Sequence, residues 1–173
     1  LVDVEPQYGN DLMTTIDIDV QDVADRALRN KLKEETVNGE IGMAMVMEVA
    51  TGDVKAIVNL RRGEDGEYYE MKNHLVSDLM EPGSTFKTAS IMVALEDGKI
   101  NKNTRVDTGK GLWPMYGRTM KDHNWTKGGY GTINVTRVLM KSSNIGVSRL
   151  IDAAYHDDPD RYVRGLNNLG VGI

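Results

Sequence analysis

The order of apolar and polar residues predicts that the chain opens with a strand and an amphipathic helix. In residues 14–20, TTIDIDV, an apolar side chain recurs at every second position, which is the pattern of a half-buried strand. Residues 21–32, QDVADRALRNKL, place their apolar side chains on one helical stripe. Asp19 precedes this stripe, and we expect it to be the N-cap of the helix.

A β-hairpin is predicted next. Two apolar runs flank residues 51–53, Thr-Gly-Asp, which have the composition of a turn. The first run, residues 41–49, is almost continuously apolar, so we expect both faces of this strand to be covered. Met43, Met45 and Met47 fall on one face, and core packing is the simplest role for them.

Helical patterns dominate the second half of the chain. Residues 84–97 are apolar on nearly all sides, which predicts a buried helix, and Gly98 is its expected stop. Residues 101–130 are rich in glycine and read as a long irregular span. Two further helices are expected over residues 135–141 and 145–155, and a short last helix follows them.

Composition narrows the class of protein. The 173 residues are 40% hydrophobic and 27% charged, which is typical of a globular domain of ordinary size. A net charge of −5 argues against a nucleic-acid partner, because phosphate binding favours a basic surface. Cysteine is absent, and no apolar run reaches the roughly 18 residues that span a bilayer. His74, His123 and His156 are widely spaced, so we predict neither a metal nor a cofactor.

One pair of residues carries candidate chemistry. Ser84 and Lys87 lie three positions apart at the front of the predicted buried helix, and this spacing places them on one face. A serine hydroxyl needs a base to become a nucleophile. A lysine amine serves as that base only if burial lowers its pKa well below the ordinary value of about 10.4. The simpler interpretation is an N-cap serine beside a solvated lysine.

A second motif, Ser142-Ser143-Asn144, lies between two predicted helices. Its simpler interpretation is a helix break with Asn144 as the N-cap. The combination of Ser-x-x-Lys with Ser-x-Asn is more specific than either motif, because it occurs in penicillin-binding proteins and serine β-lactamases.

Five stretches together resemble the transpeptidase domain of class B penicillin-binding proteins, most nearly the division-type enzymes. They are TTIDIDVQDVADRAL, GMAMVMEVATGDVKAIV, EPGSTFKTASIMVALEDGKI, TRVDTGKG and RVLMKSSNIGVSRL. The resemblance implies an α+β fold: an antiparallel sheet flanked by helices, plus a mostly helical subdomain. Residues 1–100 would form the sheet and central-helix part, and residues 101–173 the helical subdomain.

The resemblance also implies a role for each motif residue. Ser84 would be the acylated nucleophile, Lys87 the base, Ser142 a proton relay, and Asn144 a hydrogen-bonding partner of the substrate peptide. The substrate would be the D-alanyl-D-alanine end of a peptidoglycan stem peptide, and β-lactam antibiotics would acylate the same serine. The implied setting is the periplasmic, extracytoplasmic face of the cell membrane, with an N-terminal membrane anchor and division-complex membrane proteins as partners.

The family's third motif, Lys-Thr-Gly, does not follow Ser142-Ser143-Asn144 in these 173 residues. We therefore expect the chain to be an N-terminal part of the domain, inactive alone and prone to self-association through unpaired sheet edges. Two alternatives stay open from the sequence. One is a serine β-lactamase or D,D-carboxypeptidase, and the other is a non-catalytic penicillin-sensing domain.

Overall fold

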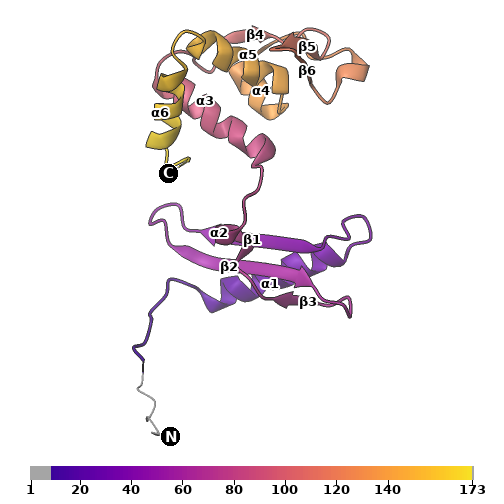
Figure 1. Cartoon of the computed structure of the whole chain (residues 1–173), viewed down its shortest axis with the longest axis vertical. Helices are drawn as coiled ribbons and strands as arrows, with labels where there is room; N and C mark the ends of the chain where they lie inside the picture. Colours follow the sequence, from indigo (N-terminus) through magenta and orange to yellow (C-terminus); the bar gives the residue numbers. More distant parts are fainter. Residues whose placement is uncertain (1–8, 173) are drawn as a thin grey trace, which may run out of the picture. The chain divides into compact units, whose positions relative to one another are not determined.

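The computed structural model describes residues 9–172, in two compact units (Figure 1). The first unit ends at Met80 and the second begins at Glu81. The predicted domain, residues 1–173, includes residues 1–8 and 173, which lie outside the described part. The predicted division into a sheet and central-helix part, residues 1–100, and a helical subdomain, residues 101–173, stays a prediction.

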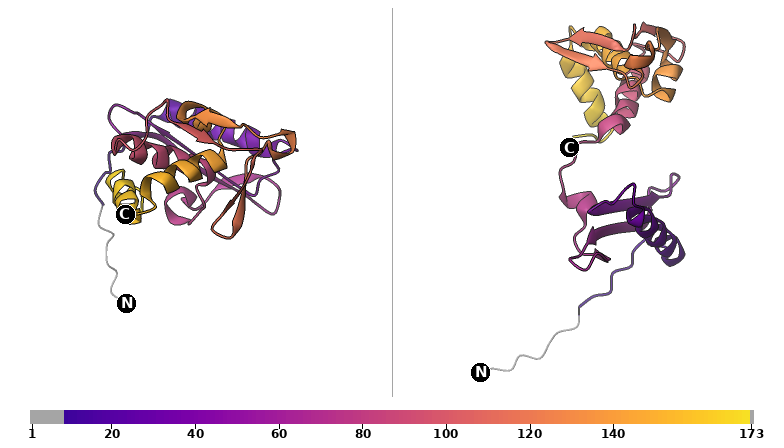
Figure 2. Two further views of the ribbon diagram at one scale, coloured as in Figure 1. Left: turned by 90° about the horizontal axis from the view of Figure 1, so that it is seen from above. Right: turned by 90° about the vertical axis from the view of Figure 1, so that its right-hand side faces the viewer.

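The first unit is a three-stranded antiparallel sheet with a helix on one face (Figure 2). Its elements are α1 (Ile18–Lys33), β1 (Ile41–Met47), β2 (Val54–Arg62), β3 (Tyr68–Glu70) and the short α2 (His74–Ser77). The strand order is β1-β2-β3. The alternating residues Ala56, Val58 and Leu60 of β2 are fully buried, and Val58 and Leu60 pack in a cluster with Leu32 and Tyr68. The predicted hairpin is confirmed, with Gly52 at φ +79° in its turn.

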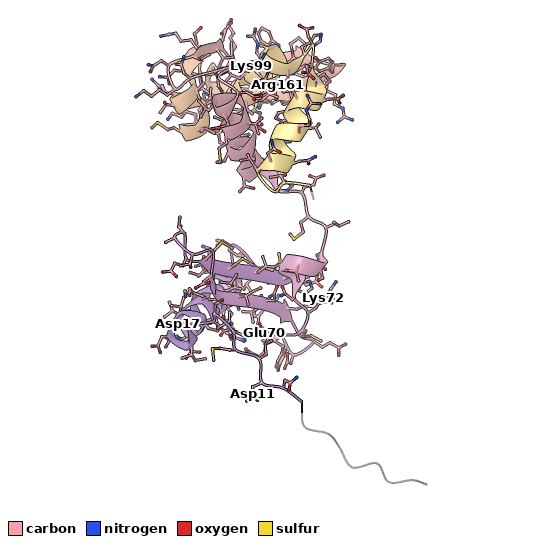
Figure 3. All side chains as sticks on the ribbon, turned by 90° about the vertical axis from the view of Figure 1, so that its left-hand side faces the viewer. Asp11, Asp17, Glu70, Lys72, Lys99 and Arg161 are labelled. Carbon is pink, nitrogen blue, oxygen red and sulfur yellow. The ribbon has the colours of Figure 1, made fainter. Side chains whose placement is uncertain are left out.

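The strand predicted over residues 14–20 is wrong. Asp17, labelled in Figure 3, caps α1 by accepting hydrogen bonds from the amides of Asp19 and Val20, so Asp17 and not Asp19 is the N-cap. This segment does contact the first residues of β2, which β3 does not pair, because the Asp17 amide donates to the Lys55 carbonyl at 3.0 Å. The local cap turns the chain into a helix before a ladder of hydrogen bonds forms.

The expectation that both faces of β1 are covered is also wrong for this unit. Met45 and Met47 are 41% and 52% exposed, and Met43 is half-buried. β1 lies at the edge of the sheet, whereas β2 lies between its neighbours and supplies the core. A continuous apolar run does not distinguish a central strand from an edge strand.

The second unit is mostly helical. Its helices are the 3₁₀ turn η1 (Gly83–Thr85), α3 (Phe86–Glu96), the 3₁₀ turn η2 (Trp125–Lys127), α4 (Val135–Met140), α5 (Asn144–Tyr155) and α6 (Pro159–Asn168). Its strands form two ladders, β4 (Arg105–Asp107) with β7 (Thr132–Asn134) and β5 (Leu112–Met115) with β6 (Arg118–Lys121). Its buried core includes Ile91, Val138, Val147 and Leu150.

Two expectations for this unit need correction. Residues 101–130 are not irregular, because they contain β4 and the β5–β6 hairpin, which turns at Tyr116 and Gly117 with positive φ angles. α3 is not buried on all sides, since Met92 and Leu95 are 48% and 42% exposed. Its other face packs on α5 and α6, where Gly165 lets the backbone of α6 approach Val93 closely.

The helices predicted around residues 142–144 and the short last helix are confirmed. The α+β class is confirmed as well, with antiparallel strands flanked by helices and a helical second unit. Among residues 9–172, no helix is long and apolar enough to cross a membrane.

Candidate active site

The predicted site residues Ser84, Lys87 and Ser142 come together in the second unit. Gly83, at φ +57°, turns the chain so that Ser84 stands on the 3₁₀ turn in front of α3. The Lys87 Nζ lies 3.0 Å from the Ser84 Oγ, 2.9 Å from the Ser142 Oγ and 2.7 Å from the Ser142 carbonyl oxygen. One amine thus joins two hydroxyl groups that are far apart in the sequence.

Ser142 reaches Lys87 because of how α4 ends. The Ser143 amide donates to the Val138 carbonyl at 3.0 Å, and the Ser142 amide donates to the Leu139 carbonyl at 2.9 Å. These two bonds form a Schellman motif, in which the residue at the position of Ser142 adopts a left-handed conformation and is usually glycine. Ser142 has φ +49°. Strain of this kind is concentrated at functional sites, and here it directs both oxygens of one serine to the lysine.

Burial lowers the pKa of the Lys87 ammonium below its ordinary value, because the charged form loses water. The negative charge of Asp122 acts in the opposite direction and raises this pKa. The first effect is the larger. In the neutral form, the amine has two N–H groups for the Ser142 oxygens and a lone pair for the Ser84 proton. The arrangement therefore suits a base that activates Ser84.

Asn144 begins α5 but is not its N-cap. The N-cap is Ser143, whose hydroxyl oxygen accepts a hydrogen bond from the Gly146 amide at 2.8 Å. The exposed Asn144 side chain donates from Nδ2 to the Lys121 carbonyl at 2.7 Å. This bond orients the side-chain amide, which lines the same cavity as Lys87.

That cavity has a volume of about 420 Å³ and lies between α3, α5, α6 and the β5–β6 hairpin. Apolar residues dominate its wall, among them Phe86, Met115, Met120, Val147 and Ile151. Lys87 and Asn144 are among the polar residues that line it. A pocket with apolar walls and a few convergent polar groups is the usual form of a small-molecule site.

Two residues at the site were missed by the sequence reasoning. Asp122 and Ser143 are 1% and 0% exposed, and the Ser143 hydroxyl donates to the Asp122 carboxylate at 2.7 Å. The one available signal was that the first turn of α5 contains no acidic residue, although a helix N-terminus favours one. Nothing in the spacing of the chain indicates that Asp122 supplies this charge.

Within residues 9–172, no group of three or more His, Cys, Asp or Glu side chains could hold a metal ion. The exposed His123 contacts the Tyr130 hydroxyl through its ring nitrogens.

Comparisons with known proteins show the family to which this chain is related. The family described as the penicillin binding protein transpeptidase domain matches residues 42–173. The peptidoglycan D,D-transpeptidase FtsI of Escherichia coli K12 is 32% identical over 177 residues, which covers 96% of this chain and 29% of the relative. The FtsI of Buchnera aphidicola is 32% identical over 153 residues, which covers 85% of this chain and 25% of the relative. The chain thus spans little more than a quarter of these relatives.

A solved structure of a transpeptidase domain is similar to this chain in fold and in sequence. The transpeptidase domain of penicillin-binding protein 3 from Burkholderia pseudomallei matches with a TM-score of 0.75 and 30% identity, covering 92% of this chain and 42% of the other.

Proposed function

This chain belongs to the penicillin-binding protein transpeptidase family, and we propose that the whole protein is a peptidoglycan D,D-transpeptidase. The family predicted from the sequence motifs is thereby confirmed. The observation that carries the proposal is the Lys87 amine between the Ser84 and Ser142 hydroxyls, 3.0 and 2.9 Å away. The substrate class comes from the names of the relatives and from the family resemblance.

The proposed reaction has two steps. In the first, neutral Lys87 takes the Ser84 proton, and the Ser84 Oγ bonds to the carbonyl carbon of the penultimate D-alanine. Ser142 relays a proton to the departing nitrogen, so the terminal D-alanine leaves as a neutral amine. Asn144 holds the donor peptide. In the second step, an amine of a neighbouring stem peptide bonds to the ester carbonyl carbon, the C–O bond to Ser84 breaks, and Lys87 passes the proton lost by the amine to the Ser84 oxygen.

A stem peptide ending in D-alanyl-D-alanine, supplied with an acceptor amine, tests this proposal on the whole protein. We expect one D-alanine to be released for each cross-link formed, and Ser84→Ala to abolish both products. Thr88→Ala is the matched control, because this exposed residue follows Lys87 on the same helix. Release without cross-linking would indicate a D,D-carboxypeptidase. Rapid β-lactam turnover would indicate a β-lactamase, and acylation with neither product a penicillin sensor.

We also propose that these 173 residues are inactive by themselves. Among them, no Lys-Thr-Gly follows Asn144. In the family, the strand that carries this motif supplies an oxyanion N–H group and binds the substrate carboxylate. Incubation of the chain with a fluorescent penicillin should give no labelling. Stoichiometric labelling that depends on Ser84 would contradict this.

Two proposals concern partners and location. Because β1 is an edge strand of the described sheet, we propose that the chain alone self-associates, which a clean monomer in sedimentation would contradict. For the whole protein, the FtsI relatives and the resemblance favour a division complex at the periplasmic face of the membrane. Localisation of a tagged protein away from the division septum would contradict that assignment.

A further inference from the structure

Asp122 is a buried carboxylate that no motif includes. Its side chain is 1% exposed, and burying an ionisable group is unfavourable unless hydrogen bonds compensate. Here Oδ2 accepts from the Ser143 hydroxyl at 2.7 Å, and Oδ1 accepts from the Ile145 amide at 3.1 Å. Both donors belong to the first turn of α5 or its cap, where a negative charge also complements the helix dipole.

The backbone around Asp122 is fixed as well. Its amide donates to the Gly111 carbonyl at 3.0 Å, and its carbonyl accepts from the Trp125 amide at 3.1 Å. The preceding residue, Lys121, ends β6 and accepts the Asn144 side chain through its carbonyl at 2.7 Å. Two consecutive residues at the end of one hairpin therefore hold the segment that contains Ser142 and Asn144.

We propose that Asp122 is a positioning residue, which fixes the start of α5 through Ser143 and Ile145 so that Ser142 and Asn144 stay aligned with Lys87. This inference rests on the proposed function, because it concerns the same acylation. It assigns Asp122 no contact with substrate. The carboxylate acts through the cap residue Ser143, which stands between two residues of the Ser-x-Asn motif.

Asp122 also acts on Lys87 through its charge. Of the described residues, it is the charged group whose field raises the pKa of Lys87, against the larger lowering by burial. The other groups that line the cavity or contact the amine come from η1, the end of α4, α5 and α6: Ser84, Ser142, Asn144, Asp152 and Tyr162. Asp152 is itself bound by the Tyr116 hydroxyl. Removing the charge of Asp122 should therefore lower the pKa of Lys87 further.

The first test measures acylation of the whole protein by a fluorescent penicillin between about pH 5 and 9. Asp122→Ala should lower the plateau rate constant by about 10- to 100-fold, the usual effect of a small misplacement at a reacting centre. Asp122→Asn keeps the size of the side chain, and it should lower the plateau less while moving the acidic limb of the profile to lower pH. Asp97→Asn is the matched control, since Asp97 is paired with Arg161 outside the cavity.

An unchanged rate and pH profile in both Asp122 variants would overturn the proposal. A loss of rate that matches the loss of folded protein, with the pH profile of the remaining activity unchanged, would overturn it too. Asp97→Asn should keep the wild-type rate and profile. If Asp122→Ala does not fold, Asp122→Asn decides, because its shifted acidic limb is not a consequence of instability.

A second measurement separates this inference from the proposed function. The ionisation of Lys87 can be followed in the 173-residue chain by NMR of lysine labelled with ¹³C at Cε, which requires no activity. Asp122→Asn should lower the pKa of Lys87, and Asp97→Asn should leave it unchanged. An equal Lys87 pKa in wild type and Asp122→Asn would contradict the inference even if the protein reacts with penicillin. If the wild type does not react, the proposed function fails, and the NMR result still shows whether the charge of Asp122 acts on Lys87.

Discussion

Lys87→Met removes the amine at the centre of the site and keeps a side chain of similar length. In the wild type, the Nζ lies 3.0 Å from the Ser84 Oγ, within the reach of a general base. General base catalysis contributes about 10²- to 10⁴-fold to a rate, which corresponds to about 3 to 5 kcal/mol of transition-state stabilisation. We therefore expect acylation of Ser84 by a penicillin to slow by that factor. Lys87→Arg should lose as much, because a guanidinium does not give up its proton.

The same substitution should change how stability depends on pH. The pKa of Lys87 is lower in the folded state than in the unfolded state, so above the folded-state pKa the unfolded chain binds more protons. Wild-type stability therefore rises with pH through this range, up to the unfolded value of about 10.4. Below it, the folded state carries a partly desolvated charge. Lys87→Met lacks this charge, so its stability relative to wild type should be highest below the folded-state pKa of Lys87 and decline as the pH rises above it.

The assays are acylation by a fluorescent penicillin in the whole protein and urea unfolding from about pH 6 to 9. Thr88→Ala is the control for both, and it should match the wild type. Acylation of Lys87→Met at the wild-type rate would refute the assignment of the base. A stability difference that grows in favour of Lys87→Met with rising pH would refute the sign of the pKa shift.

Three further predictions concern the fold around the site. Gly165→Ala should destabilise the protein by about 1 to 3 kcal/mol in urea unfolding, because the new Cβ would overlap the Val93 Cγ1. The double variant with Val93→Ala should recover part of this loss, because the overlapping methyl group is removed. Arg161 lowers the pKa of Asp97 below its ordinary value of 3.8, so this carboxylate stabilises the fold above pH 3.8 and less as the pH falls below it. Asp97→Asn should flatten that acid loss in a pH titration of the melting temperature, and an unchanged acid limb would contradict the pairing. Leu60→Ala should lower the free energy of unfolding by about 2 to 5 kcal/mol, because Leu60 is fully buried, and a loss below 1 kcal/mol would contradict its core position.

The sequence was sufficient for the parts of the site that depend on short spacing. Ser84 and Lys87 face each other because residues three positions apart lie on the same face of a helical segment. The meeting of Lys87 with Ser142 followed from the family resemblance, since local patterns do not indicate which helix end approaches which. Neither short spacing nor the family resemblance indicated a role for Asp122. Its partners Ser143 and Ile145 are distant in the sequence, and the residues around Asp122 have the composition of a loop.

The errors in the fold have local causes. Residues 14–20 alternate like a strand, but a single side-chain cap at Asp17 starts the helix at Ile18. The apolar run of β1 indicated a covered strand, but its place at the sheet edge leaves Met45 and Met47 exposed. Periodicity describes what a segment can form, whereas caps and neighbours decide where the segment begins and how much of it is buried.

Mass spectrometry of the whole protein after reaction with a penicillin tests the account most directly. The reacted protein is digested, and the modified peptide is sequenced. We predict one added mass, equal to that of the intact antibiotic, on Ser84, and its loss in Ser84→Ala and near loss in Lys87→Met. No adduct, or an adduct on another residue, would contradict the assignment of Ser84 as the nucleophile that Lys87 activates.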